Sequence, residues 1–173
     1  MNIRKFKPDD AETCFRLRSN AFIQKFYNEL SLQEIASAVN AYMPDDYTRM
    51  AVEMPFFTVE ESGKIIGFFN LNRKDEKTAE LPLIYIDLDT LGKGIGSACI
   101  DYIEQWLSSN WKSVTKLIVD TVIPKYNSRF YENMGFKPIG DTYCEFMGRK
   151  IKALRLAKKI EKLKSADFPT NRG

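Results

Sequence analysis

Three glycines separated by single residues, Gly92, Gly94 and Gly96, are the first candidates for chemistry in this sequence. They follow a strand-like segment and precede a helix-like one. The first turn of a helix has N–H groups without partners and carries partial positive charge, and glycines let a phosphate approach that backbone closely. Lys93 adds a cation between two of the glycines. The segment therefore predicts an anion-binding site, although the same glycines are also typical of a tight turn between strand and helix.

Two well-known phosphate-binding loops differ from this segment. A P-loop ends in Gly-Lys-Ser/Thr, whereas Ser97 follows Gly96 directly. The dinucleotide fingerprint G-x-G-x-x-G/A would need glycine or alanine where Ser97 or Cys99 stands. Asp120, at the end of the next predicted strand, stands where a dinucleotide-binding fold has the acid that binds ribose. However, the glycine loop lies in mid-chain after several predicted strands, and not in a first βαβ unit. A nicotinamide-binding oxidoreductase is therefore kept only as an alternative.

The composition excludes several kinds of chemistry. The chain has no histidine, so no Ser-His-Asp triad, Cys-His pair or histidine-ligated zinc can form. Cys14, Cys99 and Cys144 are far apart and make no CxxC, which predicts no disulfide, no metal site and a cytoplasmic compartment. The net charge of +3 is too small to indicate nucleic-acid binding. No apolar run is long enough to predict a membrane span.

The 173 residues fit one domain, which we expect to comprise residues 1–160, followed by a frayed or disordered tail over 161–173. Apolar periodicity predicts the order β-α-α-β-β-β-α-β-α-β-β. Pro44 ends the second helix, and only a short turn is expected over 45–52. Pro82, inside the strand before the glycines, implies an unused ladder position or a bulge. The predicted strands cover 2–6, 56–60, 65–71, 80–88, 117–122, 136–139 and 150–158, and the predicted helices begin near 11, 31, 95 and 127.

Two segments of the chain resemble motifs of a known family. The run AELPLIYIDLDTLGKGIG, from Ala79 to Gly96, resembles the acetyl-CoA-binding motif of the GCN5-related N-acetyltransferase (GNAT) superfamily, a strand followed by Q/R-x-x-G-x-G/A at a helix start. The run NSRFYENMGF, from Asn127 to Phe136, resembles its second motif. The resemblance spans roughly residues 2–157. It implies a single α/β (α+β) domain whose mixed, mostly antiparallel sheet has splayed central strands flanked by helices.

The resemblance implies a set of cofactor-binding residues. Acetyl-CoA would be held by main chain of the glycine loop and of the strand before it, with the Ile86 amide polarising the thioester carbonyl. Leu91 stands at the Q/R position, so a side-chain contact to the diphosphate is absent while the main-chain cradle stays. The expected cofactor-binding residues are Ile84, Ile86, Leu91, Gly92, Lys93, Gly94, Ile95, Gly96, Ser97, Asn127 and Tyr131.

The reaction implied is direct attack of a primary amine on acetyl-CoA. The amine must lose a proton first, and without histidine the base is a carboxylate acting through water, or a tyrosine. Glu80 is the first candidate because several family members carry a catalytic glutamate there, and Asp120 is the second. Tyr131 corresponds to the tyrosine that protonates the leaving thiolate. Glu60 and Glu145 are weaker candidates for the base.

The family builds its acceptor pocket from the early helices and the last hairpin. These segments carry aromatic and acidic side chains that would suit a cationic acceptor: a small amine, polyamine, aminosugar or peptide amine. A non-catalytic CoA-binding module is the alternative, favoured by Leu91 and opposed by Asn127 and Tyr131. We expect no nucleic-acid or membrane partner, and a homodimer stays open. The aromatic and acidic side chains expected to bind the acceptor are those of Phe22, Phe26, Tyr27, Glu29, Tyr42, Asp45, Asp46, Tyr47 and Tyr143.

Overall fold

A single mixed sheet runs through the part of the chain that the computed structural model describes, residues 1–122 and 124–161, with the side chains of 124–128 also outside this description. The strand order is β1-β2-β3-β4-β5-β7-β6. Among the described strand pairs, only β4–β5 is parallel. The strands are β1 (Asn2–Lys5), β2 (Phe56–Glu61), β3 (Lys64–Arg73), β4 (Thr78–Ile86), β5 (Lys116–Thr121), β6 (Lys137–Phe146) and β7 (Arg149–Lys159).

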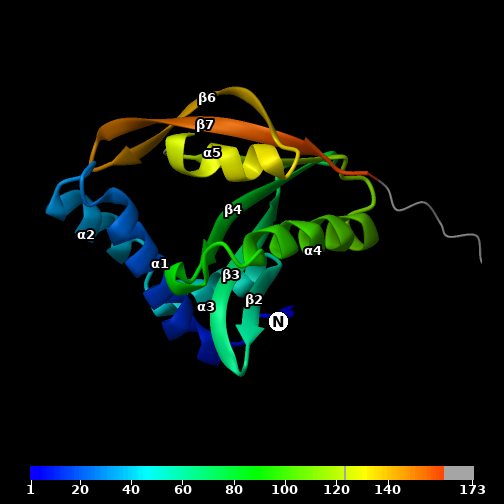
Figure 1. Cartoon of the computed structure of the whole chain (residues 1–173), viewed down its shortest axis with the longest axis horizontal. Helices are drawn as coiled ribbons and strands as arrows, with labels where there is room; N and C mark the ends of the chain where they lie inside the picture. Colours follow the sequence, from blue (N-terminus) through cyan, green and yellow to red (C-terminus); the bar gives the residue numbers. More distant parts are fainter. Residues whose placement is uncertain (123, 162–173) are drawn as a thin grey trace, which may run out of the picture.

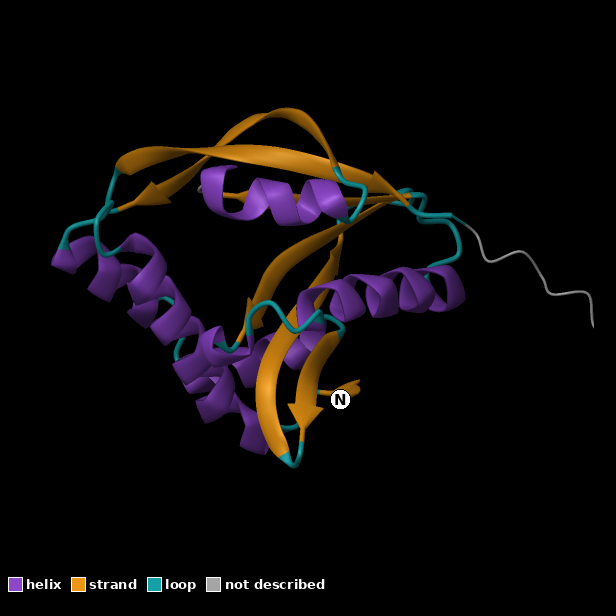
Figure 2. Cartoon of the chain, in the orientation of Figure 1, coloured by secondary structure: helices purple, strands orange, loops and turns teal. Residues whose placement is uncertain are grey.

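Helices cover both faces of the sheet, so the described part has three layers (Figures 1 and 2). On one face lie α1 (Ala11–Phe26), α2 (Leu32–Asn40) and α3 (Pro44–Glu53), and on the other lie α4 (Ile95–Asn110) and α5 (Pro124–Asn133). Two 3-10 turns, η1 (Pro8–Asp10) and η2 (Leu88–Thr90), precede α1 and α4. The predicted fold class and the predicted splayed strands are confirmed.

One helix differs from the sequence prediction. The segment 45–52, expected to be a short turn, belongs to the ten-residue helix α3, in which Pro44 is the first residue. Proline is favoured at that position because its missing N–H would have no partner there. Asp46 accepts a hydrogen bond from the Met43 N–H at 2.7 Å and so satisfies one free donor at the start of the helix. Pro44 therefore ends α2 and starts α3.

Alternating phenylalanines on β2 and β3 anchor the two helical layers. Phe57 and Phe69 stack on each other in the core shared with α4. Phe56 and Phe68 point to the other face, where both rings meet the edge of Tyr47 at 6.3 and 5.7 Å between centroids. Tyr47 is fully buried in this core, so it is a packing residue and not the acceptor-pocket residue that the sequence suggested.

A bulge in β4 sets the shape of the centre. Asn70 is opposite Leu83 and Asn72 is opposite Glu80, so β4 carries one extra residue around Pro82. The parallel ladder between β4 and β5 ends at Glu80 opposite Ile118, although β4 continues for six more residues. The two strands therefore part beyond Glu80, beside the segment that leads to α4.

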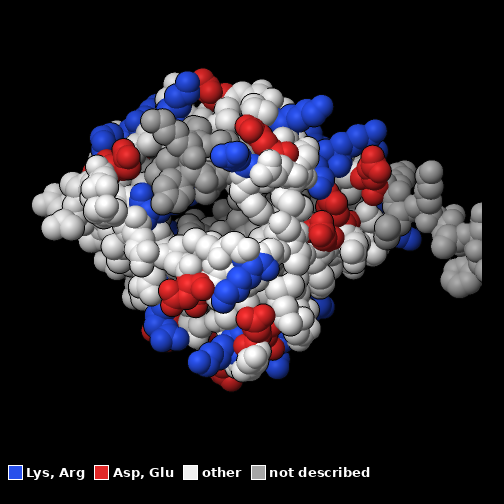
Figure 3. Space-filling model, viewed as in Figure 1, with Lys and Arg blue, Asp and Glu red and all other residues white. Residues whose placement is uncertain are grey.

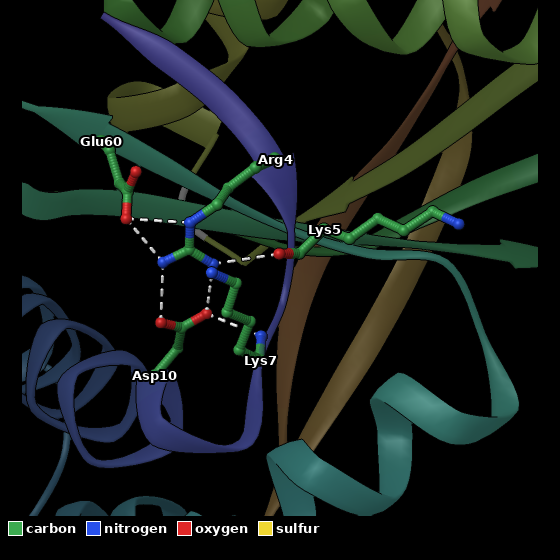
Figure 4. Close-up of polar contacts among 5 residues, drawn as sticks. All are labelled: Arg4, Lys5, Lys7, Asp10 and Glu60. Atoms are coloured by element: carbon green, nitrogen blue, oxygen red, sulfur yellow. Dashed lines mark hydrogen bonds and ion pairs between the residues drawn. The ribbon is translucent and has the colours of Figure 1, made fainter.

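An arginine fixes the start of α1 against the sheet (Figure 4). Arg4 on β1 donates to Glu60 at 2.6 and 2.8 Å and to Asp10 at 2.7 and 2.9 Å. The Lys7 N–H also donates to Asp10, at 2.7 Å. Burial raises the pKa of Asp10, but the hydrogen bonds from Arg4 and Lys7 outweigh it and leave the pKa below its ordinary value. This network positions α1, which forms one wall of the site described next.

Candidate active site

A cavity of about 870 Å³ opens where β4 and β5 part. Figure 3 shows the hollowed face of the molecule. The walls come from α1, β4, η2, the glycine loop, α4 and α5. The lining residues are Ala21, Gln24, Lys25, Ile84, Tyr85, Ile86, Leu88, Asp89, Thr90, Leu91, Gly92, Gly94, Ile95, Gly96, Ser97, Phe130 and Tyr131.

The glycine loop brings the start of α4 to this cavity. Gly92 and Gly94 have φ of +79° and +78°, a left-handed conformation that other residues adopt only at a cost. Gly94 is the N-cap of α4, so the first free N–H groups of the helix come directly after it. Leu91 lines the cavity with 59% of its surface exposed, whereas Lys93 is exposed and is not among the lining residues. The loop therefore offers main chain to an anion.

Gly96 allows α4 to approach α5. A Cβ atom at this position would lie 3.0 Å from the ring of Phe130, closer than ordinary van der Waals contact. Phe130 also lines the cavity, although it was not among the predicted cofactor-binding residues and directly precedes Tyr131 in the second motif. The third glycine is therefore needed for helix packing as well as for access to the main chain.

Tyr131 lies at the wall that α5 contributes. It is only 5% exposed and packs edge-on against Phe130 and Phe136, with centroids 5.1 and 5.4 Å apart. Burial, and to a smaller extent the nearby Tyr85, raise the pKa of Tyr131 above its ordinary value. The phenol therefore keeps its proton at neutral pH and can donate a hydrogen bond. The side chain of Asn127 lies outside the described residues, so its predicted contact to the cofactor stays a prediction.

The cavity passes through the sheet. Beyond the bulge, Ile84 and Ile86 face the core shared with α4 and α5, whereas Tyr85 faces the core shared with α1 and α3. All three line the cavity, together with Ala21 and Lys25 on α1. The gap between β4 and β5 therefore connects the two faces, and a molecule on the α4 side can meet another on the α1 side.

The two candidate bases share a face of the sheet but differ in their partners. Glu80 alternates with core residues of β4, and Asp120 with core residues of β5, so both point toward the α1 side. Both oxygens of Asp120 accept from Arg155, at 2.7 Å each. Only Oε2 of Glu80 is engaged by described residues, Asn72 at 3.2 Å and Lys74 at 3.4 Å. Neither acid is among the lining residues. Glu80 therefore has the freer carboxylate.

The predicted acceptor residues lie elsewhere. Phe22 and Phe26 are buried, stack with centroids 4.4 Å apart and contact Phe146 of β6. Asp46 caps α3 and pairs with Arg49. None of the aromatic or acidic residues expected to bind the acceptor is among the lining residues. Instead, α1 contributes Ala21, Gln24 and Lys25 to the lining. The sequence did not predict these three residues, because only the tertiary structure shows which face of α1 meets the cavity.

The described residues contain neither a metal-binding cluster of side chains nor a helix that could cross a membrane. Within residues 1–122 and 124–161, no group of three or more Asp, Glu or Cys side chains is placed to hold a metal ion. No helix in these ranges has the length and apolarity to cross a membrane. Cys14 and Cys99 are fully buried, and burial raises the pKa of the Cys99 thiol to about 12, which leaves it unreactive at neutral pH.

Comparison with known proteins agrees with this geometry. The solved structure of PaiA N-acetyltransferase from Thermoplasma acidophilum, in complex with coenzyme A, superposes with a TM-score of 0.77 at 21% identity, covering 91% of this chain and 98% of that one. Ribosomal-protein-alanine N-acetyltransferase from Brucella melitensis gives a TM-score of 0.66 at 17% identity, covering 92% and 99%. A point mutant of spermidine N-acetyltransferase SpeG from Vibrio cholerae gives 0.67 at 17%, covering 92% and 95%.

At these identities the solved structures support the fold alone. No curated protein matches the sequence significantly. A family model, that of the acetyltransferase (GNAT) family, matches residues 21–136, which is more than half of the chain and includes the glycine loop and Tyr131. This match leaves the nicotinamide alternative without support. The chain belongs to the acetyltransferase (GNAT) family of acetyl-CoA-dependent N-acetyltransferases.

Proposed function

We propose that this protein transfers an acetyl group from acetyl-CoA to a primary amine by direct attack. The observation that carries the proposal is the cavity through the gap between β4 and β5, which joins the start of α4 and Tyr131 on one face to α1 on the other. Such a passage lets a cofactor and an acceptor meet from opposite sides. The coenzyme A complex of the Thermoplasma protein, which has this fold, supports acetyl-CoA as the acetyl donor.

The residues present fit a diphosphate and a pantetheine arm. The diphosphate would meet the free N–H groups that follow Gly94 at the start of α4. The Asp87 N–H points toward β3, where it donates to the Ile66 carbonyl at 2.8 Å. Because N–H directions alternate along a strand, those of Ile84 and Ile86 point to the edge of β4 that has no partner strand. That edge can pair with the pantetheine amides, and the Ile86 N–H can polarise the thioester carbonyl.

The chain's own side chains would handle the protons. When bound, acetyl-CoA would supply the thioester whose C–S bond breaks as the C–N bond to the amine forms. Glu80 would accept the proton of the ammonium group through a water molecule, since its Oε1 has no described partner and it faces the α1 side. Tyr131 would donate a hydrogen bond to the leaving thiolate, because burial keeps its phenol protonated.

Amine-dependent release of thiol tests this proposal. The full chain is incubated with acetyl-CoA and a panel of primary amines, while free thiol and acetylated amine are measured and CoA binding is followed by calorimetry. Thiol release that requires an amine supports the proposal. Tight CoA binding without release on any amine would indicate the non-catalytic module instead. No CoA binding at millimolar concentration would contradict the cofactor assignment.

The compartment and the assembly state are also proposals. We expect the protein to act in the cytoplasm, because Cys14, Cys99 and Cys144 are all free thiols. A homodimer, the absence of a nucleic-acid partner and the domain end at residue 160 stay predictions. Ile160 is 3% exposed and donates its N–H to the Thr115 carbonyl at 2.9 Å, which supports a domain that extends this far.

A further inference from the structure

Lys25 is an unusual side chain for a cavity wall. It is half-buried on α1, and no described carboxylate lies within ion-pair distance of it. Burial lowers the pKa of Lys25 to about 8, because the ammonium loses water and no described carboxylate pairs with it. Its Nζ lies 5.7 Å from the centroid of the Phe26 ring, a cation–π contact that leaves its N–H groups without an acceptor. The only other described charged side chain in the lining is Asp89, on η2. The cavity therefore contains a cation that no acid of the described chain neutralises.

The neighbouring cation on α1 has a structural role that Lys25 lacks. Arg18 lies two turns before Lys25, on the same side of the helix. Its terminal nitrogens donate to the Ala38 and Val39 carbonyls at 2.9 and 3.4 Å, and its guanidinium stacks on Tyr42 at 4.7 Å from the ring centroid. Arg18 therefore holds the last turn of α2. Lys25 makes no hydrogen bond to a described residue, so its position in the lining is free for a ligand.

The face of the sheet on which Lys25 lies indicates which of the two ligands it would contact. The glycine loop, Ile84, Ile86 and Tyr131 belong to the α4 and α5 side, where the diphosphate and pantetheine are proposed to bind. Lys25 belongs to α1, on the side of Glu80 and Tyr85. The two sides communicate through the gap between β4 and β5. A ligand group beside Lys25 is therefore part of the molecule that enters from the α1 side, the acceptor.

We infer that Lys25 binds an anionic group of the acceptor, so that the amine acetylated by this protein also carries a carboxylate or a comparable anion. This inference rests on the proposed function. The expected class is amines that also carry a carboxylate, such as amino acids and short peptides, in place of the cationic acceptors that the aromatic and acidic side chains of the early helices and the last hairpin suggested.

Matched acceptors that differ only in charge test this inference. Amino acids and their primary amides, each with the same free amine, are compared with wild type, Lys25→Met and Lys25→Arg. Wild type is expected to have at least a ten-fold lower KM for the acid than for the amide, since a hydrogen bond to a charged group is worth about that factor. Lys25→Met should remove this difference with kcat changed less than three-fold, and Lys25→Arg should restore most of it. Lys64→Met, which removes one charge from the β2–β3 hairpin, is the control and should behave as wild type.

Other outcomes would overturn the inference without touching the proposed function. Equal KM for acid and amide in wild type would show that no anion is recognised, even if both are acetylated. A weaker affinity of Lys25→Met for CoA itself, measured by calorimetry, would assign the lysine to the cofactor phosphates. Acetylation of Lys25 by acetyl-CoA alone, read from the mass of the intact protein, would make the lysine a substrate. If the wild-type protein acetylates no amine at all, that result would instead contradict the proposed function.

Discussion

The wall of the cavity formed by β4, η2 and α4 presents mostly main chain, whereas the wall formed by α1 presents side chains. On the first wall, Gly92, Gly94 and the β4 edge beyond Glu80 expose N–H groups whose directions follow from the secondary structure. On the second, Gln24 and Lys25 project from a helix whose backbone groups are already bonded within the helix. We therefore propose that the two walls recognise their ligands by different means.

From this difference we propose that the first wall serves every acceptor, whereas the second selects among acceptors. Main-chain recognition depends on conformation, and proteins that share only 17–21% identity with this chain have the same fold. Side-chain recognition changes with each substitution on α1. We expect changes on the first wall to affect cofactor use for every acceptor, and changes on the second wall to affect the choice of acceptor.

The largest effect is expected where the two walls meet, at Tyr131. Tyr131→Phe removes the hydrogen bond to the leaving thiolate and should lower kcat by about 10²-fold or more, with little change in the affinity for CoA. Thiol release and calorimetry measure the two quantities. Tyr102→Phe on α4, outside the lining, is the control and should keep full activity. Full turnover in Tyr131→Phe would contradict the assignment of this tyrosine.

A smaller effect should separate the two acids on the acceptor side. Glu80→Gln is expected to lower kcat/KM by about 10- to 100-fold, because the carboxylate that takes the proton is lost. Asp120→Asn should change kcat/KM less than three-fold but lower the melting temperature, because Arg155 loses a two-point partner. Initial rates and thermal unfolding of both variants test this. A greater loss of activity in Asp120→Asn would reverse the assignment.

On the main-chain wall, Gly96→Ala should weaken CoA binding about ten-fold. The added Cβ would lie 3.0 Å from the Phe130 ring, so α4 or Phe130 must shift beside the site of the diphosphate. Gly140→Ala is a matched control, since a Cβ there would meet no atom within 4 Å. Calorimetry with CoA gives the comparison. Unchanged affinity in Gly96→Ala would mean that this contact does not shape the cofactor site.

The hydrogen-bond network of Arg4 and Asp10 at the start of α1 should affect stability and not catalysis. Arg4→Met leaves the buried Asp10 carboxylate with fewer partners, which is expected to lower the free energy of unfolding by about 2–3 kcal/mol at pH 7. Because Asp10 has a lowered pKa when folded, its pairing stabilises the protein above about pH 4 and is lost as the pH falls further. Urea unfolding at pH 7 and pH 3 should show a smaller difference between variant and wild type at the lower pH. An equal difference at both pH values would contradict the role of this pair.

Local signals in the sequence predicted most of the fold. Ser31 and Glu34 form the capping box that starts α2, with hydrogen bonds of 2.8 and 3.3 Å, and Gly135 has a φ of +85° after α5. The helix α3 was missed because Pro44 can both end one helix and begin the next. Pro82 predicted either an unused ladder position or a bulge, because proline has no N–H to donate to a ladder, and β4 has a bulge there.

The residues of the candidate site were predicted unevenly. The glycine loop and Tyr131, which line the cavity, were predicted because each lies in a short motif whose spacing is read directly along the chain. Glu80 was ranked before Asp120 from the family resemblance alone, since the pairing of Asp120 with Arg155 depends on β7, which brings Arg155 beside β5 from 35 residues away. Lys25 had no signal either, since a lysine on a helix is ordinarily a solvated side chain.

The sequence by itself determined the main-chain wall, the order of the elements and the absence of imidazole chemistry, because these depend on residue type and on neighbours within a few positions. Only the tertiary structure decided where β4 and β5 separate, which acid keeps a free oxygen and which face of α1 meets the cavity. Those properties arise from contacts between segments far apart in the chain, and their energies depend on burial and partner geometry that no local spacing encodes.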